Sequence, residues 1–443
     1  MKCEEARDQL VAYARGELEG SEKSRVEEHL VRCQGCTREL EGARQVMAVT
    51  QMADDESIGD LANQIVTAAL ERRASDIHLE TFDSGPVVRV RVDGVLHRLD
   101  KDLTPTKEQW EGLVARFKLM AGCSLSERRM PQDGRMLMSV GERTYDLRMS
   151  FVPTIHGESL VARILDKQSV LLGLDRLGLS QENLAKVREL MRQPRGMIVV
   201  TGPTGSGKTT LLYSILMELN RPEVKILTVE DPVEYAIEGI NQVAVNAQSG
   251  LTFASALRAF LRHDPDIIMV GEIRDQATAA VANQAALTGH LVLATLHTQD
   301  APGAFTRLID IGLPGFVVSA GALGAIAQRL VRCICPGCKT EYHPDEAERT
   351  NVGVPGQDKG SVLYRGAGCE QCRGTGYRGR IAIHEVLVLT PEIHKLISAN
   401  APSEGIRQAA IAAGMKTMRE DAMEKVRAGV TTMEEAEWVL MGR

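Results

Sequence analysis

A glycine-rich segment near the middle of the chain has the pattern that holds nucleotide phosphates. TGPTGSGKTT (201–210) follows the apolar run MIVV (197–200) and precedes a stretch of helical periodicity. In this context it predicts a P-loop, whose backbone N–H groups face phosphate oxygens at a helix N-terminus, rather than a plain glycine turn. Lys208 would reach the β- and γ-phosphates, and the Thr209 hydroxyl would ligate Mg²⁺. The residues expected to bind nucleotide are Gly202, Pro203, Thr204, Gly205, Ser206, Gly207, Lys208, Thr209 and Thr210.

Carboxylates follow two other apolar runs. Glu272 lies just after DIIMV (266–270), and Glu230 and Glu234 lie after KILTV (225–229). The carboxyl ends of parallel strands form the ligand-binding edge of an α/β sheet. Glu272 could there orient the attacking water or hold the Mg²⁺ water shell, with Glu230 and Glu234 as a second acidic edge. Solvated charges in a turn are the alternative for any one of these carboxylates.

Two histidines lie at the ends of one further apolar run, LVLAT (291–295). His290 precedes the run and His297 follows it. A histidine beside a strand is as often a packed or surface residue as a functional one, so the residues alone leave both possibilities open. One of them could carry the state of the γ-phosphate to a neighbouring subunit.

Eight of the nine cysteines fall into two groups with metal-ligand spacing. Four of them form C-x2-C-x30-C-x2-C, which suits a zinc site with four thiolates and a structural or docking role; free thiols are the alternative. Cys333 is expected to be a bystander. Near the N-terminus, C-x25-H-x3-C-x2-C offers three thiolates and one imidazole. The expected zinc ligands are Cys335, Cys338, Cys369 and Cys372 in the first set and Cys3, His29, Cys33 and Cys36 in the second.

Composition limits the kind of protein that carries these groups. The 443 residues are too many for one core, so two to four domains are expected. The first 60 residues hold 8 Lys/Arg against 14 Asp/Glu, which disfavours binding to nucleic acid. Neither a membrane-spanning apolar run nor a signal peptide is recognisable in the sequence, so a cytoplasmic protein is expected.

The elements that would position the candidate residues follow from periodicity. From Pro194 on, apolar runs alternate with helical stretches, which predicts an α/β fold with a parallel sheet. VVRVRVDGVLHRL (87–99) predicts a hairpin that turns at Asp93-Gly94. Residues 4–48 predict two or three short helices. The final hundred residues predict helices interrupted by a cysteine-bearing loop region.

Four segments together resemble, in order and spacing, the secretion-superfamily ATPases of type II secretion and type IV pilus assembly. These segments are TGPTGSGKTT, TVEDPVE, LRHDPDIIMVGEIRD and TGHLVLATLHT. The resemblance covers residues 60–443 and implies a RecA-like core that hydrolyses ATP with Mg²⁺ in a homohexamer. It also implies that Glu272 is the catalytic carboxylate and that Glu230 and Glu234 support metal and water. His290 and His297 lie in the family's His box.

The region before the core also resembles this family. ASDIHLE, RMPQDGR, YDLRMS and PTIHGESLVARIL are similar to its PAS-like α+β domain. The resemblance points to Arg135 and Arg148 as cations that reach the phosphates; a surface ion pair is the alternative. The four-cysteine set is typical of the assembly motors of the family rather than its retraction motors. Residues 3–36 resemble the zinc-binding anti-sigma fold, whose commonest use is protein–protein contact.

These observations predict a specific domain order and function. We expect a helical zinc module (1–50), an acidic linker (51–60), a PAS-like domain (61–168) and a RecA-like domain (169–443) that includes a zinc module (333–380). The expected function is assembly of a type IV pilus or a type II secretion pseudopilus through an inner-membrane platform protein. The alternatives are a retraction motor and a zinc-dependent, nucleotide-switched regulator. The partner of the N-terminal module stays open.

Overall fold

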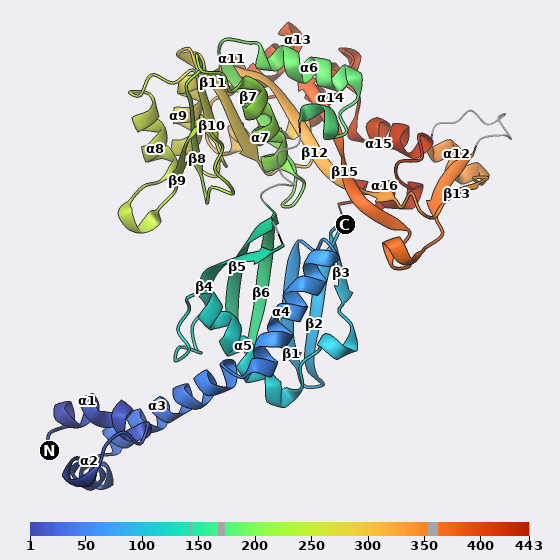
Figure 1. Ribbon diagram of the computed structural model, residues 1–443. Coiled ribbons are helices and arrows are strands. Elements are labelled where there is room, and N and C mark those ends of the chain that lie inside the picture. Colours follow the sequence, from blue (N-terminus) through green and yellow to red (C-terminus); the bar gives the residue numbers. More distant parts are fainter. Residues whose placement is uncertain (142, 167–172, 353–361, 443) are drawn as a thin grey trace. The chain divides into compact units, whose positions relative to one another are not determined.

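The computed structural model describes residues 1–141, 143–166, 173–352 and 362–442. The chain forms two compact units, Met1–Lys167 and Gln168–Arg443, each with its own sheet (Figure 1). The expected boundary between residues 168 and 169 lies outside the described residues, as do residues 353–361 of the expected zinc module.

Three helices form the N-terminal module, as expected. They are α1 (Cys3–Ala14), α2 (Gly20–Arg32) and α3 (Gln34–Ala53). Their shared core is small and is built around the buried residues Ala6, Leu10, Val26, Cys36 and Leu40. A core of this size contributes little stability by itself, so a metal cross-link would add substantially to the stability of the module.

The expected acidic linker over 51–60 is wrong. α3 continues to Ala53 and α4 (Glu56–Glu71) begins three residues later, with the Asp55 carboxylate capping the Ser57 N–H at 2.8 Å. Two apolar residues in this acidic stretch are buried, since Ala53 and Ile58 are 0% and 5% exposed. Ala53 packs against Ala115 of α5 (Lys107–Met120), so the module and the following domain are joined by packed helix.

The rest of the first unit is an antiparallel sheet covered by two helices. Its strand order is β3-β2-β1-β6-β5-β4, and α4 and α5 pack on it (Figure 1). The predicted hairpin is confirmed, because Asp93 and Gly94 both have positive φ between β2 and β3. The strands are β1 (Asp76–Phe82), β2 (Gly85–Val92), β3 (Val95–Arg98), β4 (Gln132–Val140), β5 (Arg143–Thr154) and β6 (Gly157–Asp166).

The second unit contains the predicted α/β sheet, in the order β15-β12-β7-β11-β10-β8-β9. All four apolar runs that predicted strands are confirmed as parallel neighbours. Successive residues of β7 alternate between two cores, with Met197 and Val199 in one and Ile198 and Val200 in the other. The strands are β7 (Gly196–Thr201), β8 (Ile226–Glu230), β9 (Asn241–Ala244), β10 (Ile267–Val270), β11 (Leu291–Leu296), β12 (Ala322–Ile334) and β15 (Tyr377–Val388).

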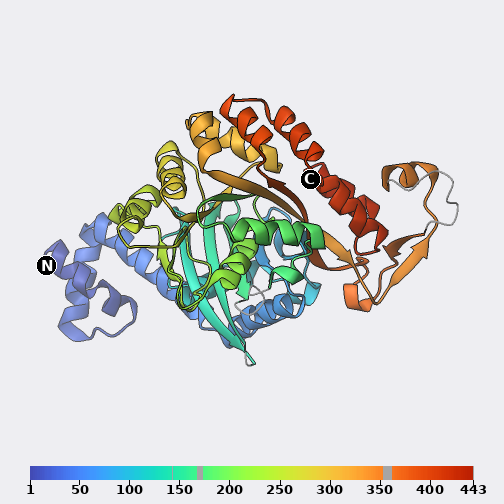
Figure 2. The same cartoon turned by 90° about the horizontal axis from the view of Figure 1, so that it is seen from above.

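Helices cover both faces of this sheet. The green helices α6 (Gln181–Met191) and α7 (Lys208–Leu219) lie on one side in Figure 2, and the olive to red helices lie on the other. Side-chain oxygens of Ser180, Thr252, Asp275 and Asp300 cap the N-termini of four helices. The second group of helices includes α8 (Phe253–Phe260), α9 (Gln276–Leu287), α10 (Ala301–Asp310) and α11 (Gly315–Gly321).

The C-terminal region is only partly helical, which corrects the expectation from sequence. β15 pairs with β12 almost throughout, and β13 (Lys339–Tyr342) pairs with β14 (Leu363–Gly366) around the cysteines. The expected helices follow as α13 (Pro391–Ser398), α14 (Ser403–Ala412), α15 (Met418–Arg427) and α16 (Met433–Leu440). Across the described part of the chain, no helix is long and apolar enough to cross a membrane.

Truncation of Phe117 in α5 should destabilise the first unit. Phe117 is fully buried beneath the sheet, whereas Leu119 on the same helix is 39% exposed. Phe117→Ala should lower the free energy of unfolding by about 3–5 kcal/mol, because a cavity remains. Leu119→Ala, the matched control, should cost less than about 1 kcal/mol.

Urea denaturation, followed by tryptophan fluorescence in a Trp438→Phe background, measures this effect. Trp110 is then the remaining tryptophan, and it is buried in the first unit, so its fluorescence reports the unfolding of that unit. Equal midpoints for the two α5 variants would contradict the assigned packing of α5.

Candidate active site and metal clusters

The glycine-rich segment joins β7 to α7, as the P-loop pattern predicted. β7 ends at Thr201 and α7 begins at Lys208, with Gly207 at the N-cap in the left-handed region (φ 87°). Gly202 and Gly205 also have positive φ, at 147° and 78°. Residues with a side chain rarely adopt these angles, so the turn that opens the helix N-terminus requires glycine.

Lys208 lies folded over this loop. Its Nζ donates to the carbonyl oxygens of Gly202 at 2.7 Å and Pro203 at 3.0 Å. Burial lowers the pKa of Lys208 to about 8, although the charge of Glu272 acts in the opposite direction. A phosphate oxygen would be a stronger partner for this ammonium than either neutral carbonyl.

Glu272, His297 and Lys208 form a connected chain at the carboxyl edge of the sheet. Nε2 of His297 lies 3.0 Å from Oε1 of Glu272, and Nδ1 of His297 lies 3.4 Å from Nζ of Lys208. Burial, followed by the charge of Lys208, lowers the pKa of His297. A neutral ring protonated at Nε2 fits both contacts. The structure therefore brings three of the predicted residues together.

Arg274 was not singled out from the sequence, although it lies in the quoted GEIRD segment. Its Nη2 is 2.8 Å from Oε2 of Glu272. Burial alone would raise the pKa of Glu272, but the hydrogen bond from Arg274 and the charges of Arg274 and Lys208 outweigh it. The pKa of Glu272 therefore lies below its usual value, and the carboxylate is ionised at neutral pH.

His290 lies away from this chain of residues. It precedes β11, and its carbonyl accepts from the Gly196 N–H at the amino end of β7, opposite to the P-loop. Its Nδ1 is 3.0 Å from the carbonyl oxygen of Ala285 at the end of α9. The structure therefore does not bring His290 to the phosphate loop of its own chain.

Glu230 is buried and accepts hydrogen bonds from three protein side chains. It is 4% exposed, and its carboxylate accepts from the hydroxyl of Tyr213, from Thr228 Oγ1 at 2.6 Å and from Gln242 Nε2 at 3.1 Å. Burial, followed by the hydrogen bond to Glu230, raises the pKa of Tyr213. The structure thus disfavours a solvated turn for Glu230. Glu234 lies in the segment between β8 and β9 and is partly buried.

Arg135 and Arg148 lie opposite each other on β4 and β5. Arg135 makes a two-pronged ion pair with the buried Asp146, with Nε–Oδ1 at 2.8 Å and Nη2–Oδ2 at 2.5 Å. The hydrogen bond and the charge of Asp146 raise the pKa of Arg135. Both arginines belong to the Met1–Lys167 unit and the P-loop belongs to the other. Their contact with phosphate therefore stays a prediction.

The four C-terminal cysteines converge as a metal site requires. Their sulfur–sulfur contacts are 3.9 Å for Cys335–Cys369 and 3.7 Å for both Cys338–Cys372 and Cys369–Cys372. A tetrahedron with Zn–S bonds of about 2.3 Å has edges of about 3.8 Å. Backbone N–H groups, including that of Gly368 at 3.3 Å from Cys338 Sγ, donate to the sulfurs. The donor set therefore fits zinc.

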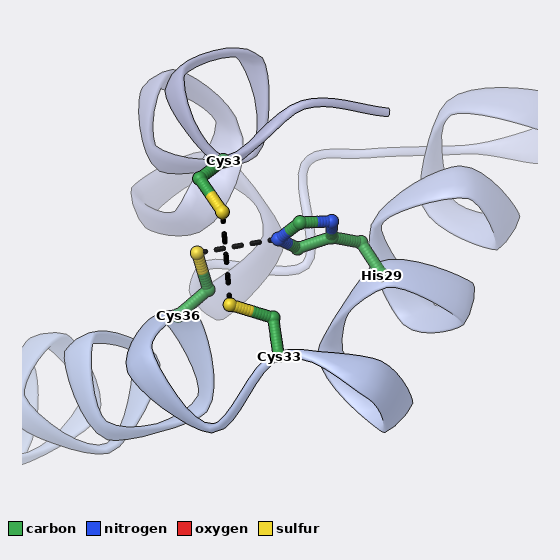
Figure 3. Close-up of side chains that lie close together, drawn as sticks. All are labelled: Cys3, His29, Cys33 and Cys36. Atoms are coloured by element: carbon green, nitrogen blue, oxygen red, sulfur yellow. Dashed lines mark hydrogen bonds between the residues drawn. The ribbon is translucent and has the colours of Figure 1, made fainter.

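The N-terminal set converges in the same way, with Cys3, His29 and Cys36 on three helices and Cys33 at the junction of α2 and α3 (Figure 3). Cys3 Sγ lies 3.7 Å from Cys33 Sγ, and His29 Nε2 lies 3.3 Å from Cys36 Sγ. Nδ1 of His29 is 3.1 Å from the carbonyl oxygen of Met1, which can only accept. The ring proton is therefore on Nδ1, and the Nε2 lone pair is left for a metal.

Comparison with known proteins agrees with this geometry. Residues 51–438 match the family described as "Type II/IV secretion system protein", and residues 3–37 match the family described as "Putative zinc-finger". The chain is 49% identical to "Type II secretion system protein E" of Pseudomonas aeruginosa, over 87% of this chain and 76% of the relative. It is 46% identical to "Type IV pilus assembly ATPase PilB" of Thermus thermophilus, over 86% and 43% of the two chains.

Solved structures have the same fold. The "Pilus Retraction Motor PilT" with bound ADP matches with a TM-score of 0.58 and 29% identity, over 84% of this chain and 95% of that one. The Legionella pneumophila ATPase DotB has a TM-score of 0.64 and 21% identity, over 86% and 95%, and supports the fold alone. The chain therefore belongs to the family of type II/IV secretion system ATPases.

Proposed function

We propose that this ATPase is a homohexameric, Mg²⁺-dependent motor. It would drive assembly of a type IV pilus or a type II secretion pseudopilus through an inner-membrane platform protein, from the cytoplasmic side of the membrane. The chain of contacts from Lys208 through His297 to Glu272 carries the proposal. Lys208, which would bind phosphate, and the carboxylate of Glu272 contact the two ring nitrogens of one histidine. The names of the relatives, secretion ATPases and a pilus assembly ATPase, support the cellular role.

The residues of the site have separate tasks in this proposal. Lys208 and the loop N–H groups hold the β- and γ-phosphates, and Glu272 orients the attacking water and receives its proton. Thr209 would hold Mg²⁺, and Glu230 and Glu234 would support the metal and its water. The ion would neutralise charge on the phosphates. His297 contacts both Lys208 and Glu272, so it can respond to an occupied γ-phosphate position.

The two metal clusters have supporting tasks. Two of the four C-terminal cysteines precede β13 and two follow β14, and a zinc site with four thiolate ligands has no open coordination position for catalysis. It also favours an assembly motor over a retraction motor, although the similarity to PilT keeps retraction as the second candidate. The N-terminal cluster would cross-link the three helices of the small module through zinc. We propose that this module binds a protein partner of the motor.

Substitution of Lys208 should remove turnover and leave the fold unchanged. Lys208→Ala should lower ATP hydrolysis by at least about 10²-fold, because the cation that holds the phosphates is lost.

Glu272→Gln should lower turnover by about 10²–10⁴-fold and retain nucleotide binding. Phosphate release and binding of a fluorescent ATP analogue measure the two effects. Lys395→Ala, on an exposed side chain of α13, is the matched control.

Unchanged turnover in Lys208→Ala would overturn the proposed mechanism. Equal turnover in Glu272→Gln and the wild type would remove Glu272 from the catalytic role.

Metal analysis should find two zinc ions per chain. Cys372→Ser and Cys36→Ser should each lose one ion, because each removes a thiolate from a different set. Cys333→Ser is the matched control and should keep both. Inductively coupled plasma mass spectrometry of the purified protein gives the count. Two ions in Cys372→Ser, or a loss in Cys333→Ser, would contradict the assignment of the ligands.

The N-terminal module should be dispensable for hydrolysis and necessary for docking. The double variant Cys33→Ser/Cys36→Ser should retain ATPase activity, because these cysteines lie outside the P-loop unit. It should no longer co-purify from membranes with the partner that the intact chain captures. Capture of the same partners by both proteins would show that the module is not the dock.

A further inference from the structure

Gln328 of β12 supports the phosphate-binding loop from a position that none of the sequence motifs includes. β12 runs parallel to β7 with Ala327 opposite Thr201, so Gln328 comes beside Gly202. A Cβ at Gly202 would lie 2.3 Å from the carbonyl oxygen of Gln328, and one at Gly207 would lie 2.6 Å from its Nε2. Gly202 is therefore required by the approach of the β12 backbone as well as by its own backbone angle, and a side chain at position 207 would displace the amide of Gln328.

The side-chain amide of Gln328 has only one workable orientation. Its Nε2 donates to the carbonyl oxygen of Ser206 at 2.8 Å, inside the loop. A carbonyl can only accept, so the amide oxygen must face the other way, toward Nε2 of His384 at 3.1 Å. His384 must then donate. The order of donation is His384 to Gln328 to Ser206.

The environment of His384 fits this order. The ring is fully buried, and burial lowers its pKa to about 3, so it is neutral and has one proton. That proton is on Nε2, because Nδ1 is buried without a hydrogen-bond partner. His384 lies directly opposite Gln328 in the β12–β15 pairing. Its backbone N–H donates to Asp421 of α15 at 2.8 Å, which anchors the strand to a C-terminal helix.

The contact with Ser206 affects the group that binds phosphate. The peptide between Ser206 and Gly207 is planar and trans, so its carbonyl and its N–H point in opposite directions. A carbonyl held toward β12 directs the Gly207 N–H to the other side of the loop. P-loops present their N–H groups to phosphate on that side.

We propose that Gln328 is a positioning residue for the phosphate-binding loop and that His384 fixes the orientation of its amide. The proposal rests on nucleotide binding by this loop, which Lys208→Ala tests separately. Gln328 does not touch the nucleotide in this arrangement. It acts through Ser206, and its effect should appear mainly in nucleotide affinity.

Gln328→Leu tests the proposal, because it replaces the amide with an apolar side chain of similar size and so removes both amide hydrogen bonds. The affinity for a fluorescent ATP analogue should fall about five- to tenfold, which corresponds to the loss of one or two such bonds. KM for ATP should rise by a similar factor and kcat should change less. Gln328→Met, which keeps the length of the side chain, serves if the Leu variant does not fold.

Asn283→Leu is the matched control. Asn283 is 1% exposed in α9, and its Nδ2 donates to the carbonyl oxygen of Val317 at 3.0 Å, so this variant also removes a buried amide. Its melting temperature should fall about as far as that of Gln328→Leu, while its nucleotide affinity stays at the wild-type value. Wild-type affinity in Gln328→Leu would overturn the proposal. An equal loss of affinity in Asn283→Leu would do the same.

A double-variant cycle tests the order of donation. His384→Phe should weaken nucleotide affinity about threefold, because the amide of Gln328 loses the donor that orients it. The double variant Gln328→Leu/His384→Phe should bind no more weakly than Gln328→Leu alone. If the two losses multiply fully, His384 does not act through Gln328, and that part of the proposal is wrong.

Discussion

The candidate active site depends on the register of β7 between two neighbouring strands. Thr201, the last residue of β7, lies opposite Leu296 of β11 on one side and Ala327 of β12 on the other. The next residue of each neighbour, His297 or Gln328, therefore flanks the start of the P-loop. A shift of one residue in either pairing would turn these side chains to the opposite face of the sheet. The burial of β7 between two cores on its two faces makes such a shift costly.

Hydrogen bonds outside the ladder strengthen the same junction. The Thr201 hydroxyl lies 2.7 Å from that of Thr298 and accepts from the Thr298 N–H at 2.8 Å. This ties the residue after His297 to the strand that carries the P-loop. Together with the contact from Gln328 to Ser206, it holds the loop at both ends. The side chains that hold the loop, Thr201, Thr298 and Gln328, thus lie outside the set that is predicted to bind the nucleotide.

Local patterns predicted much of this arrangement, and long-range pairing accounts for what they missed. The P-loop, the Asp93-Gly94 hairpin and the parallel strands each follow from a few adjacent residues. β12 was missed because ALGAIAQRLVRCI is rich in residues that favour helices, and pairing with β7 and β15 outweighs that preference. The contact between Gln328 and His384 joins residues 56 apart in sequence, and only the strand register brings them together.

The cations predicted to bind phosphate already have partners within the protein. Each would have to give up those partners to bind a nucleotide. Lys208 would give up its hydrogen bonds to two carbonyl oxygens of its own loop. These oxygens are neutral, so no charge would be left unpaired. Arg135 would have to leave Asp146, whose carboxylate is 1% exposed and would remain buried without this partner. Stranding a buried charge costs several kcal/mol, about 3–5 where such pairs have been broken. We therefore expect phosphate binding to displace the present partners of Lys208 at a lower cost than the partner of Arg135. A phosphate contact by Arg135 requires either a replacement partner for Asp146 or a sharing of the guanidinium between the two anions.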